Sequence, residues 1–255
     1  MGEMERTKFN IQGLDKALGG GIPDGNIVLI SGGAGTGKST LSLQFLINGA
    51  RVFGEKGIYV STEQNEAELQ KQAEKYGWDL KDLQQKNLIK IAYFDITSGD
   101  NFLQNLDLLI KEFNPKRLVV DSLTTLTDAM IIGGLGDKNS FSLVQVVETV
   151  SPIPRTEQII SKTILYKLLK ELKNYKLTTI LTSELAEEVK ALSADGVSEF
   201  IADGVIVLHF LGVGSSEFRS MQIRKLRYSW HEKELLSYDI SSQGIEFKEQ
   251  ESFKL

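Results

Sequence analysis

Residues 32–39 read Gly32-Gly33-Ala34-Gly35-Thr36-Gly37-Lys38-Ser39, and this stretch decides the fold. It fits, without a mismatch, the pattern G-x-x-x-x-G-K-[ST] of a glycine-rich loop that binds phosphate groups. An apolar run, Ile27 to Ser31, precedes the loop, and residues with helical spacing, Gly37 to Ala50, follow it. A glycine-rich turn that matched this pattern by chance would not need an apolar strand before it or a helix after it. We therefore expect a buried strand, a phosphate loop and a helix in succession.

The residue types in this loop suit a nucleoside triphosphate with Mg²⁺, and ATP is the expected nucleotide. Small side chains let backbone N–H groups wrap the phosphates, and the start of the following helix adds partial positive charge. Lys38 offers a positive charge to the β- and γ-phosphates, and the hydroxyl of Ser39 offers a ligand to Mg²⁺. The expected nucleotide contacts here are Gly33, Ala34, Gly35, Thr36, Gly37, Lys38, Ser39 and Thr40.

Two acids at predicted strand ends can complete the site. The apolar run from Arg117 ends in Asp121, where ligands of parallel sheets bind, so Asp121 is the expected second ligand of Mg²⁺. Glu63 follows the predicted strand Gly57 to Thr62 and is the candidate general base for hydrolysis. From position alone, Asp121 could instead cap the next helix and Glu63 could simply begin one. The polar end of the predicted strand Leu177 to Ser183 could sense the γ-phosphate, and helix capping explains it equally well.

A pair of cations lies at the end of another predicted strand, Phe218 to Arg227. Side chains two apart on a strand point to the same side. The alternation predicts one shared face for Met221, Ile223, Lys225 and Arg227. Lys225 and Arg227 could then reach one polyanion and act as an arginine finger does, often from a neighbouring subunit. The alternative is a solvated basic strand end to which Arg224 also belongs.

Short β-branched runs alternate with helical patterns along the chain, which is typical of βαβ units and a parallel sheet. We expect an α/β fold with a mostly parallel central sheet flanked by helices, in a single domain over residues 1–255. Strands predominate from residue 204 onward and predict antiparallel hairpins that close one edge of the sheet. Residues 133–156, rich in glycine and proline, are expected to form an irregular insertion with one short helix. The predicted helices span residues 37–50, 65–76, 101–113 and 159–174, and the predicted strands 27–31, 57–62, 87–94, 117–121, 177–183, 204–210, 218–227, 235–240 and 244–247.

The composition excludes several classes of protein. The chain has no cysteine, which excludes disulfides, thiolate zinc sites and a cysteine nucleophile. Its formal net charge is −5, so a nucleic-acid partner would need a local basic patch. No apolar segment is long enough to span a bilayer, and the polar residues 1–10 do not form a secretory signal. We expect a cytoplasmic protein without a membrane partner.

Taken together, the motifs resemble the KaiC-like branch of the RecA/RadA ATPase superfamily over residues 10–247. Residues 13–25 (Gly-Leu-Asp-Lys-Ala-Leu-Gly-Gly-Gly-Ile-Pro-Asp-Gly) are similar to the lead-in to that branch's phosphate loop. Residues 57–63 (Gly-Ile-Tyr-Val-Ser-Thr-Glu) resemble its catalytic-glutamate strand, and residues 119–124 (Val-Val-Asp-Ser-Leu-Thr) its magnesium-binding strand. Residues 196–203 (Gly-Val-Ser-Glu-Phe-Ile-Ala-Asp) and 225–231 (Lys-Leu-Arg-Tyr-Ser-Trp-His) resemble its C-terminal motifs.

The resemblance implies a RecA-type core and a homo-oligomeric ring, usually hexameric, with nucleotide between subunits. It implies that Glu63 is the catalytic base, and that Lys225 and Arg227 contact the γ-phosphate of a neighbour. Ser229 and His231 would line the same interface near the ribose or base.

The chain also departs from the family pattern. It has one such domain where the clock proteins have two. Glu199 and Phe200 stand where their second domain has an autophosphorylated hydroxyl pair, so kinase activity is not carried over. Gln64 replaces the second acid of the catalytic pair.

The leading hypothesis is an ATPase that uses ATP and Mg²⁺ in a regulatory or signalling ring, with a protein partner that the sequence does not identify. A second hypothesis is a RecA/RadA paralogue that binds single-stranded DNA in repair, for which Arg6, Lys8 and the cations around Arg224 are the available support. A third is an ATP-dependent scaffold with little turnover.

Overall fold

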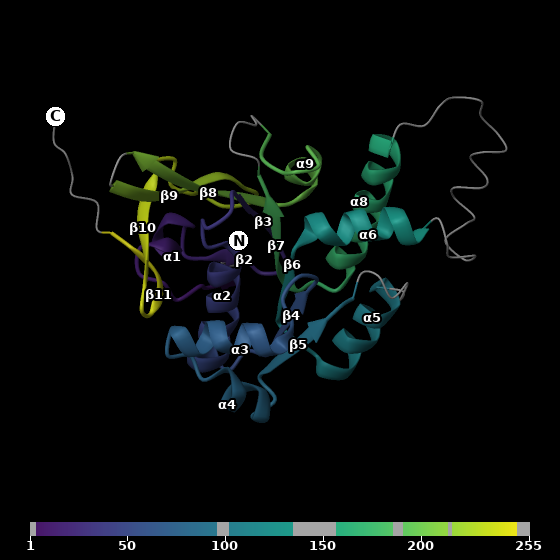
Figure 1. Cartoon of the computed structure of the whole chain (residues 1–255), viewed down its shortest axis with the longest axis horizontal. Coiled ribbons are helices and arrows are strands. Elements are labelled where there is room, and N and C mark those ends of the chain that lie inside the picture. Colours follow the sequence, from purple (N-terminus) through teal and green to yellow (C-terminus); the bar gives the residue numbers. More distant parts are fainter. Residues whose placement is uncertain (1–3, 96–101, 135–156, 186–190, 214–215, 249–255) are drawn as a thin grey trace.

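A mixed sheet of nine strands organises the chain (Figure 1). The computed structural model describes residues 4–95, 102–134, 157–185, 191–213 and 216–248. Across the sheet the strands are β11 (Gly244–Phe247), β10 (Leu236–Ser241), β9 (Ser216–Leu226), β8 (Gly204–Val213), β3 (Ile27–Gly32), β7 (Thr178–Glu184), β6 (Arg117–Asp121), β4 (Gly57–Ser61) and β5 (Ile89–Tyr93). The strands from β8 to β5 run parallel, and β9, β10 and β11 extend the β8 edge in antiparallel fashion. The predicted α/β fold, with its antiparallel C-terminal strands, is confirmed.

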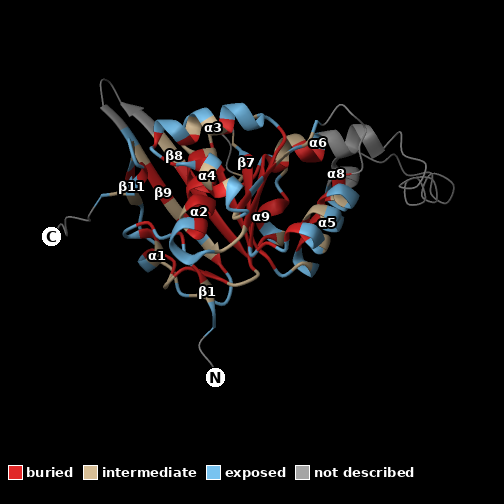
Figure 2. Cartoon of the chain, turned by 90° about the horizontal axis from the view of Figure 1, so that it is seen from below, coloured by how far each residue is buried: buried red, intermediate tan, exposed pale blue. Residues whose placement is uncertain are grey.

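Helices pack on both faces of this sheet (Figure 1). One face is covered by α2 (Lys38–Phe53), α3 (Glu66–Lys75) and α4 (Leu80–Gln85), together with α1 (Leu14–Ala17). The other carries α5 (Phe102–Phe113), α6 (Leu123–Gly134), α8 (Glu157–Asn174) and α9 (Ser198–Ile201). A separate two-stranded sheet joins β1 (Arg6–Thr7) to β2 (Ile22–Pro23). Figure 2 shows the central strands buried and the outer sides of the helices exposed. Among the described residues, no helix combines the length and apolarity that crossing a membrane requires.

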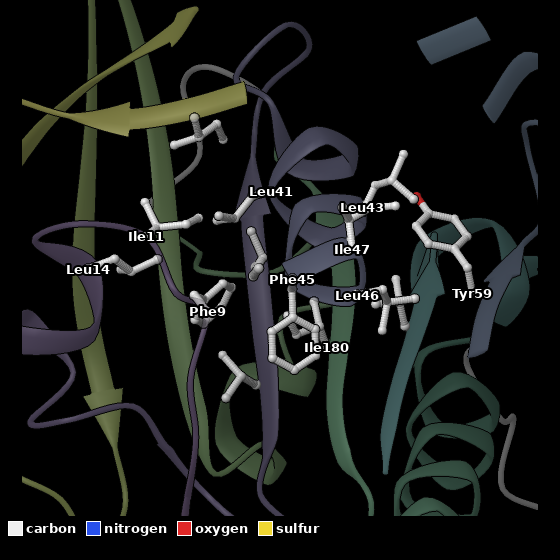
Figure 3. Packing of buried hydrophobic residues seen from close by; sticks show 14 of the residues in the cluster. Phe9, Ile11, Leu14, Leu41, Leu43, Phe45, Leu46, Ile47, Tyr59 and Ile180 are labelled. Carbon is white, nitrogen blue, oxygen red and sulfur yellow. The ribbon is translucent and has the colours of Figure 1, made fainter. Parts of the chain in front are cut away.

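Helix α2 is the centre of one hydrophobic cluster, and it carries the phosphate loop at its start. Leu41, Phe45 and Leu46 are fully buried in this cluster. Figure 3 shows them between Phe9 of the N-terminal segment on one side and Tyr59 of β4 on the other. Burying a side chain of this size contributes about 1.5–3 kcal/mol. The helix is therefore anchored along most of its length, which fixes its N-terminus relative to the strands.

Several short elements were not expected from the sequence. They are α1, α4, α9, β1 and β2, and each is six residues long or shorter. Helix α6 was not predicted either, and its last two residues are Gly133 and Gly134. The rest of the predicted insertion, residues 135–156 with its short helix, lies outside the described residues. The single-domain organisation stays a prediction.

The alternation predicted for β9 is wrong at its end. The sequence predicts a shared face for Met221, Ile223, Lys225 and Arg227. Arg224 is an extra residue, however, because Val205 pairs with Lys225 while the next residue of β8, Ile206, pairs with Ile223. A one-residue bulge reverses the alternation beyond it. Leu226 therefore packs in the cluster that contains Met221 and Ile223, and Lys225 lies on the opposite face with Val205.

Candidate functional site

The phosphate loop lies between β3 and α2, as the sequence predicts. Gly35 (φ +73°) and Gly37 (φ +93°) have positive φ values that suit glycine. A Cβ atom on Gly35 would meet no other atom within 4 Å, so the loop is open at this point. Within the described chain no side chain caps α2 at Gly37, and its first N–H groups are thus left to bind an anion.

The phosphate loop packs against β10, one of the C-terminal strands. Tyr238 of β10 is fully buried, and its hydroxyl donates to the carbonyl oxygen of Thr36 at 2.6 Å. A Cβ atom on Gly37 would lie 2.9 Å from Cδ1 of Ile240, also on β10. The Thr36 hydroxyl in turn donates to the carbonyl of Gly33 at 2.9 Å. The phosphate loop is therefore braced by a strand about two hundred residues later in the chain.

Lys38 connects the loop to the acids. Its Nζ donates to the carbonyls of Gly32 and Gly33 at 2.9 and 3.0 Å. Burial lowers the pKa of Lys38, while the nearby carboxylates of Glu184, Asp121 and Glu63 oppose this shift. The structure thus brings Lys38 together with both acids predicted from the sequence. Glu184, from the polar end of β7, joins them.

Asp121 is held by hydroxyl groups from the strands on either side. Tyr59 of β4 donates to Oδ2 and Thr182 of β7 donates to Oδ1, both at 2.5 Å. Burial and the Asp121 carboxylate raise the pKa of Tyr59 well above its usual value, and the hydroxyl of Ser39 acts in the opposite direction. The hydroxyl and the carboxylate expected to bind Mg²⁺ therefore both lie next to the same phenol.

Glu63 is fixed by a second pair of hydroxyl groups. Its Oε1 accepts hydrogen bonds from Ser122 Oγ and Thr125 Oγ1, each at 2.7 Å. Ser122 directly follows β6 and Thr125 lies in the first turn of α6, so the segment after Asp121 also orients Glu63. The side chain of Glu63 is exposed, which leaves its second oxygen open to water. This arrangement suits a carboxylate that orients or deprotonates a water molecule.

Lys225 and Arg227 are not brought to this phosphate loop within one chain. Lys225 pairs with Val205, which is in register with Leu29, whereas the loop begins beyond the other end of β3. Its Nζ donates to three backbone carbonyls at the end of α9, those of Glu199 at 3.0 Å, Phe200 at 3.2 Å and Ala202 at 2.6 Å.

Arg227 contacts the same segment. It donates to the carbonyl of Phe200 at 3.1 Å and forms an ion pair with Asp203 at 3.4 Å. Burial lowers the pKa of Lys225, and the positive charge of Arg227 acts in the same direction. The two cations therefore form one positive group at the amino end of the parallel strands.

Ser229 and His231 lie on the segment after β9, beside α1. Ser229 Oγ donates to the carbonyl of Leu18 at 3.2 Å and accepts from Arg6 at 2.8 Å. The His231 ring contacts the carbonyl of Glu232 at 2.9 Å. The contacts that the structure describes for Ser229 and His231 are thus with the N-terminal segment and their own loop, and none of them is with the phosphate loop.

Comparisons with known proteins agree with this geometry. A family model described as "ATPase: KaiC" matches residues 7–132 and 140–252.

The chain belongs to the KaiC ATPase family.

Individual proteins of known sequence or structure are similar to the chain over most of its length. The "Circadian clock oscillator protein KaiC" of Nostoc sp. is 30% identical over 254 residues, which are 95% of this chain and 44% of that protein. The chain thus spans less than half the length of this curated relative. The "UPF0273 protein PF1931" of Pyrococcus furiosus is 29% identical over 259 residues and is matched over 93% of its length. A crystal structure of KaiC-like protein PH0186 from Pyrococcus horikoshii superposes with a TM-score of 0.78 at 32% identity, covering 96% of this chain and 99% of that one.

Some site residues were missed by the sequence reasoning. The sequence places Tyr59 in the predicted strand Gly57 to Thr62 and Tyr238 in the predicted strand at residues 235–240, without a role at the site for either. A signal existed for Tyr59, because its hydroxyl group stands between the apolar residues Ile58 and Val60 in a run expected to be buried. Thr125 likewise stands one turn after Ser122, at the start of a helix that was not predicted.

Proposed function

We propose that this KaiC-family chain binds ATP with Mg²⁺ and hydrolyses it at the carboxyl ends of β3, β4 and β6. One observation carries the proposal. Lys38, at the start of α2, lies among Glu63, Asp121 and Glu184, and Glu63 is aimed by two hydroxyl groups. Open space at Gly35 and the uncapped start of α2 fit a polyphosphate.

Each residue then has a defined part in the reaction. Lys38 and the N–H groups of the loop bind the β- and γ-phosphates. Ser39 and Asp121 are the groups that would hold Mg²⁺, an ion that nucleotide sites bind through one or two protein ligands and the phosphates. When bound, Mg²⁺ neutralises charge that develops on the phosphate oxygens. Glu63 orients a water molecule for attack in line with the leaving group and accepts its proton.

We further propose that the chain assembles into a ring in which Lys225 and Arg227 act on a neighbour's nucleotide. Their position at the amino end of the sheet supports this, because they cannot serve the loop of their own chain from there. Both cations donate to the carbonyl of Phe200, and Trp230 follows Arg227 closely in the sequence. The side chains of Phe200 and Trp230 are 68% and 65% exposed, and such side chains suit burial between subunits. Ser229 and His231 would line the same interface near the ribose or base.

The biological role that we propose is regulatory or signalling, with a protein partner that responds to the nucleotide state. The name of the Nostoc relative describes a clock oscillator, and that role is not transferred, because the chain spans only 44% of that protein. The homologue from Pyrococcus furiosus, matched over 93% of its length, is of similar extent to this chain.

The function is tested by measuring ATP binding and phosphate release for the parent and for Glu63→Gln. The variant is expected to bind ATP as the parent does and to release phosphate about 100-fold more slowly, since a positioned base contributes at least this factor. Glu74→Gln is the matched control, because Glu74 is exposed and forms a surface ion pair with Lys81. Equal turnover in all three proteins would contradict the role of Glu63. A parent that binds ATP and releases no phosphate would instead indicate a scaffold.

A further inference from the structure

Tyr59 is a buried phenol in the middle of β4, between two apolar side chains. It is fully buried, and its neighbours in β4 include Ile58 and Val60. Burying a hydroxyl group is unfavourable unless it forms a hydrogen bond, and a phenylalanine would fill the same space without that requirement. The hydroxyl therefore calls for an explanation beyond packing.

The hydroxyl group reaches toward the catalytic edge of the sheet. Figure 3 shows the Tyr59 ring beside α2, running from Leu46 toward Leu43 with the oxygen at the Leu43 end. This end of α2 carries Ser39 and the phosphate loop. The oxygen donates to Oδ2 of Asp121, across 62 residues of sequence, at 2.5 Å.

Asp121 is fixed at both of its oxygens. Thr182 donates to Oδ1 at 2.5 Å, opposite the bond from Tyr59. Each carboxylate oxygen can accept more than one hydrogen bond, so both retain acceptor capacity. A carboxylate fixed in this way presents a defined set of lone pairs to a metal ion or to its water molecules, with no freedom to rotate away.

We infer that Tyr59, supported by Thr182, is a positioning residue that fixes Asp121 beside Ser39 for Mg²⁺. The inference rests on the proposed function and concerns its metal requirement. Tyr59 does not touch the nucleotide in this arrangement. It acts through Asp121, and its loss should weaken the contribution of Mg²⁺ while leaving the metal-free affinity for ATP intact.

The test compares the parent with Tyr59→Phe, which removes one oxygen atom. ATP affinity is measured by calorimetry in buffer with Mg²⁺ and in buffer with EDTA, and the ratio of the two affinities is the readout. We expect the ratio to fall about 10-fold in Tyr59→Phe. Mutation of a residue that orients a metal ligand typically lowers metal affinity by at least this factor. The affinity in EDTA should not change. The Mg²⁺ concentration that half-saturates phosphate release should rise.

Tyr175→Phe is the matched control. Tyr175 also donates from its phenol to an aspartate, Asp107, at 3.2 Å. Tyr175 directly follows α8 and Asp107 lies on α5, so both are away from the phosphate loop. This variant should retain the parent ratio. A Tyr59→Phe ratio equal to that of Tyr175→Phe would overturn the positioning role.

Thr182 provides a second and independent pair of variants. Thr182→Val removes the other donor to Asp121 at constant shape and should lower the ratio, whereas Thr182→Ser should restore it. These two decide the question if Tyr59→Phe does not fold. A parent that binds no ATP in either buffer contradicts the proposed function itself. A parent that binds ATP more tightly with Mg²⁺ than with EDTA, while Tyr59→Phe and Thr182→Val both keep the parent ratio, contradicts this inference alone.

Discussion

The ammonium group of Lys38 is half-buried among the glycines of the phosphate loop, and burial lowers its pKa from the usual 10.5. At a pH between the lowered value and 10.5, the folded chain therefore binds fewer protons than the unfolded chain. The free energy of unfolding must then rise with pH across this window. Lys38→Met lacks the titrating group and should not show this component.

The expected result is a difference in unfolding free energy, parent minus Lys38→Met, that increases as pH approaches 10.5. Urea denaturation of both proteins at several pH values measures it. The variant should also lose ATP binding at every pH. A difference that stays constant or decreases would show that burial does not disfavour the ammonium form.

For individual residues, the sequence predicted the groups expected to bind the nucleotide, Mg²⁺ and water. It did not predict the hydroxyl groups that hold them in place. Lys38, Asp121 and Glu63 each lie at or just beyond the carboxyl end of a parallel strand. The carboxyl ends of parallel strands meet at the same edge of the sheet. The hydroxyl groups of Tyr59 and Thr182 reach Asp121 only because β4 and β7 flank β6. Strand order is a property of the folded sheet, so no spacing in the sequence could reveal these contacts.

Helix α2 is flanked by two glycines of positive φ, Gly37 before its first residue and Gly54 after its last. The surroundings of these two glycines differ. Gly37 lies against Ile240 and joins the phosphate loop, whereas a Cβ atom on Gly54 would meet nothing within 4 Å. Each substitution by alanine should cost about 1 kcal/mol or somewhat more from the unfavourable backbone conformation. Only Gly37→Ala should also displace the loop, and it should therefore weaken ATP binding at least tenfold.

Thermal denaturation and calorimetric ATP titration of Gly37→Ala and Gly54→Ala test this expectation. Gly54→Ala serves as the control for a loss of helix stability without any change at the loop. Similar ATP affinities for the two variants would show that the phosphate loop tolerates a shift of the start of α2.

The elements themselves were predictable where they are long. Helices α2 and α8 show helical spacing over many residues, and the central parallel strands are short, largely apolar runs. In contrast, α1 and α9 contain four residues each, too few for a period to be visible. The bulge at Arg224 was also hidden, because a bulge is defined by the partner strand and not by the strand that contains it.

Across the whole molecule, the phosphate loop and the cations Lys225 and Arg227 lie at opposite ends of the parallel strands. If subunits associate in a ring, Arg227 of one chain completes the site of another. Arg227→Ala should then lower the turnover number roughly 1000-fold, as expected for a finger residue. Lys38→Ala should be inactive because it cannot bind ATP. A mixture of the two variants should be active. The Arg227→Ala chain supplies an intact phosphate loop, and the neighbouring Lys38→Ala chain supplies Arg227.

Phosphate release by the mixture, compared with the sum of the two separate variants, measures this complementation. Light scattering with and without ATP establishes the mass of the assembly under the same conditions. Melting curves confirm that Arg227→Ala stays folded after losing its ion pair with Asp203. A mixture no more active than the sum would contradict catalysis between subunits.

The hydrogen bond from Tyr238 to the carbonyl of Thr36 spans 202 positions of the chain. During translation, residues 32–39 leave the ribosome long before the strand that supports them has been made. A growing polypeptide therefore lacks this hydrogen bond to the phosphate loop until Tyr238 has been added. We expect ATP to stabilise chains that already contain β10, and not shorter nascent chains that end before Tyr238.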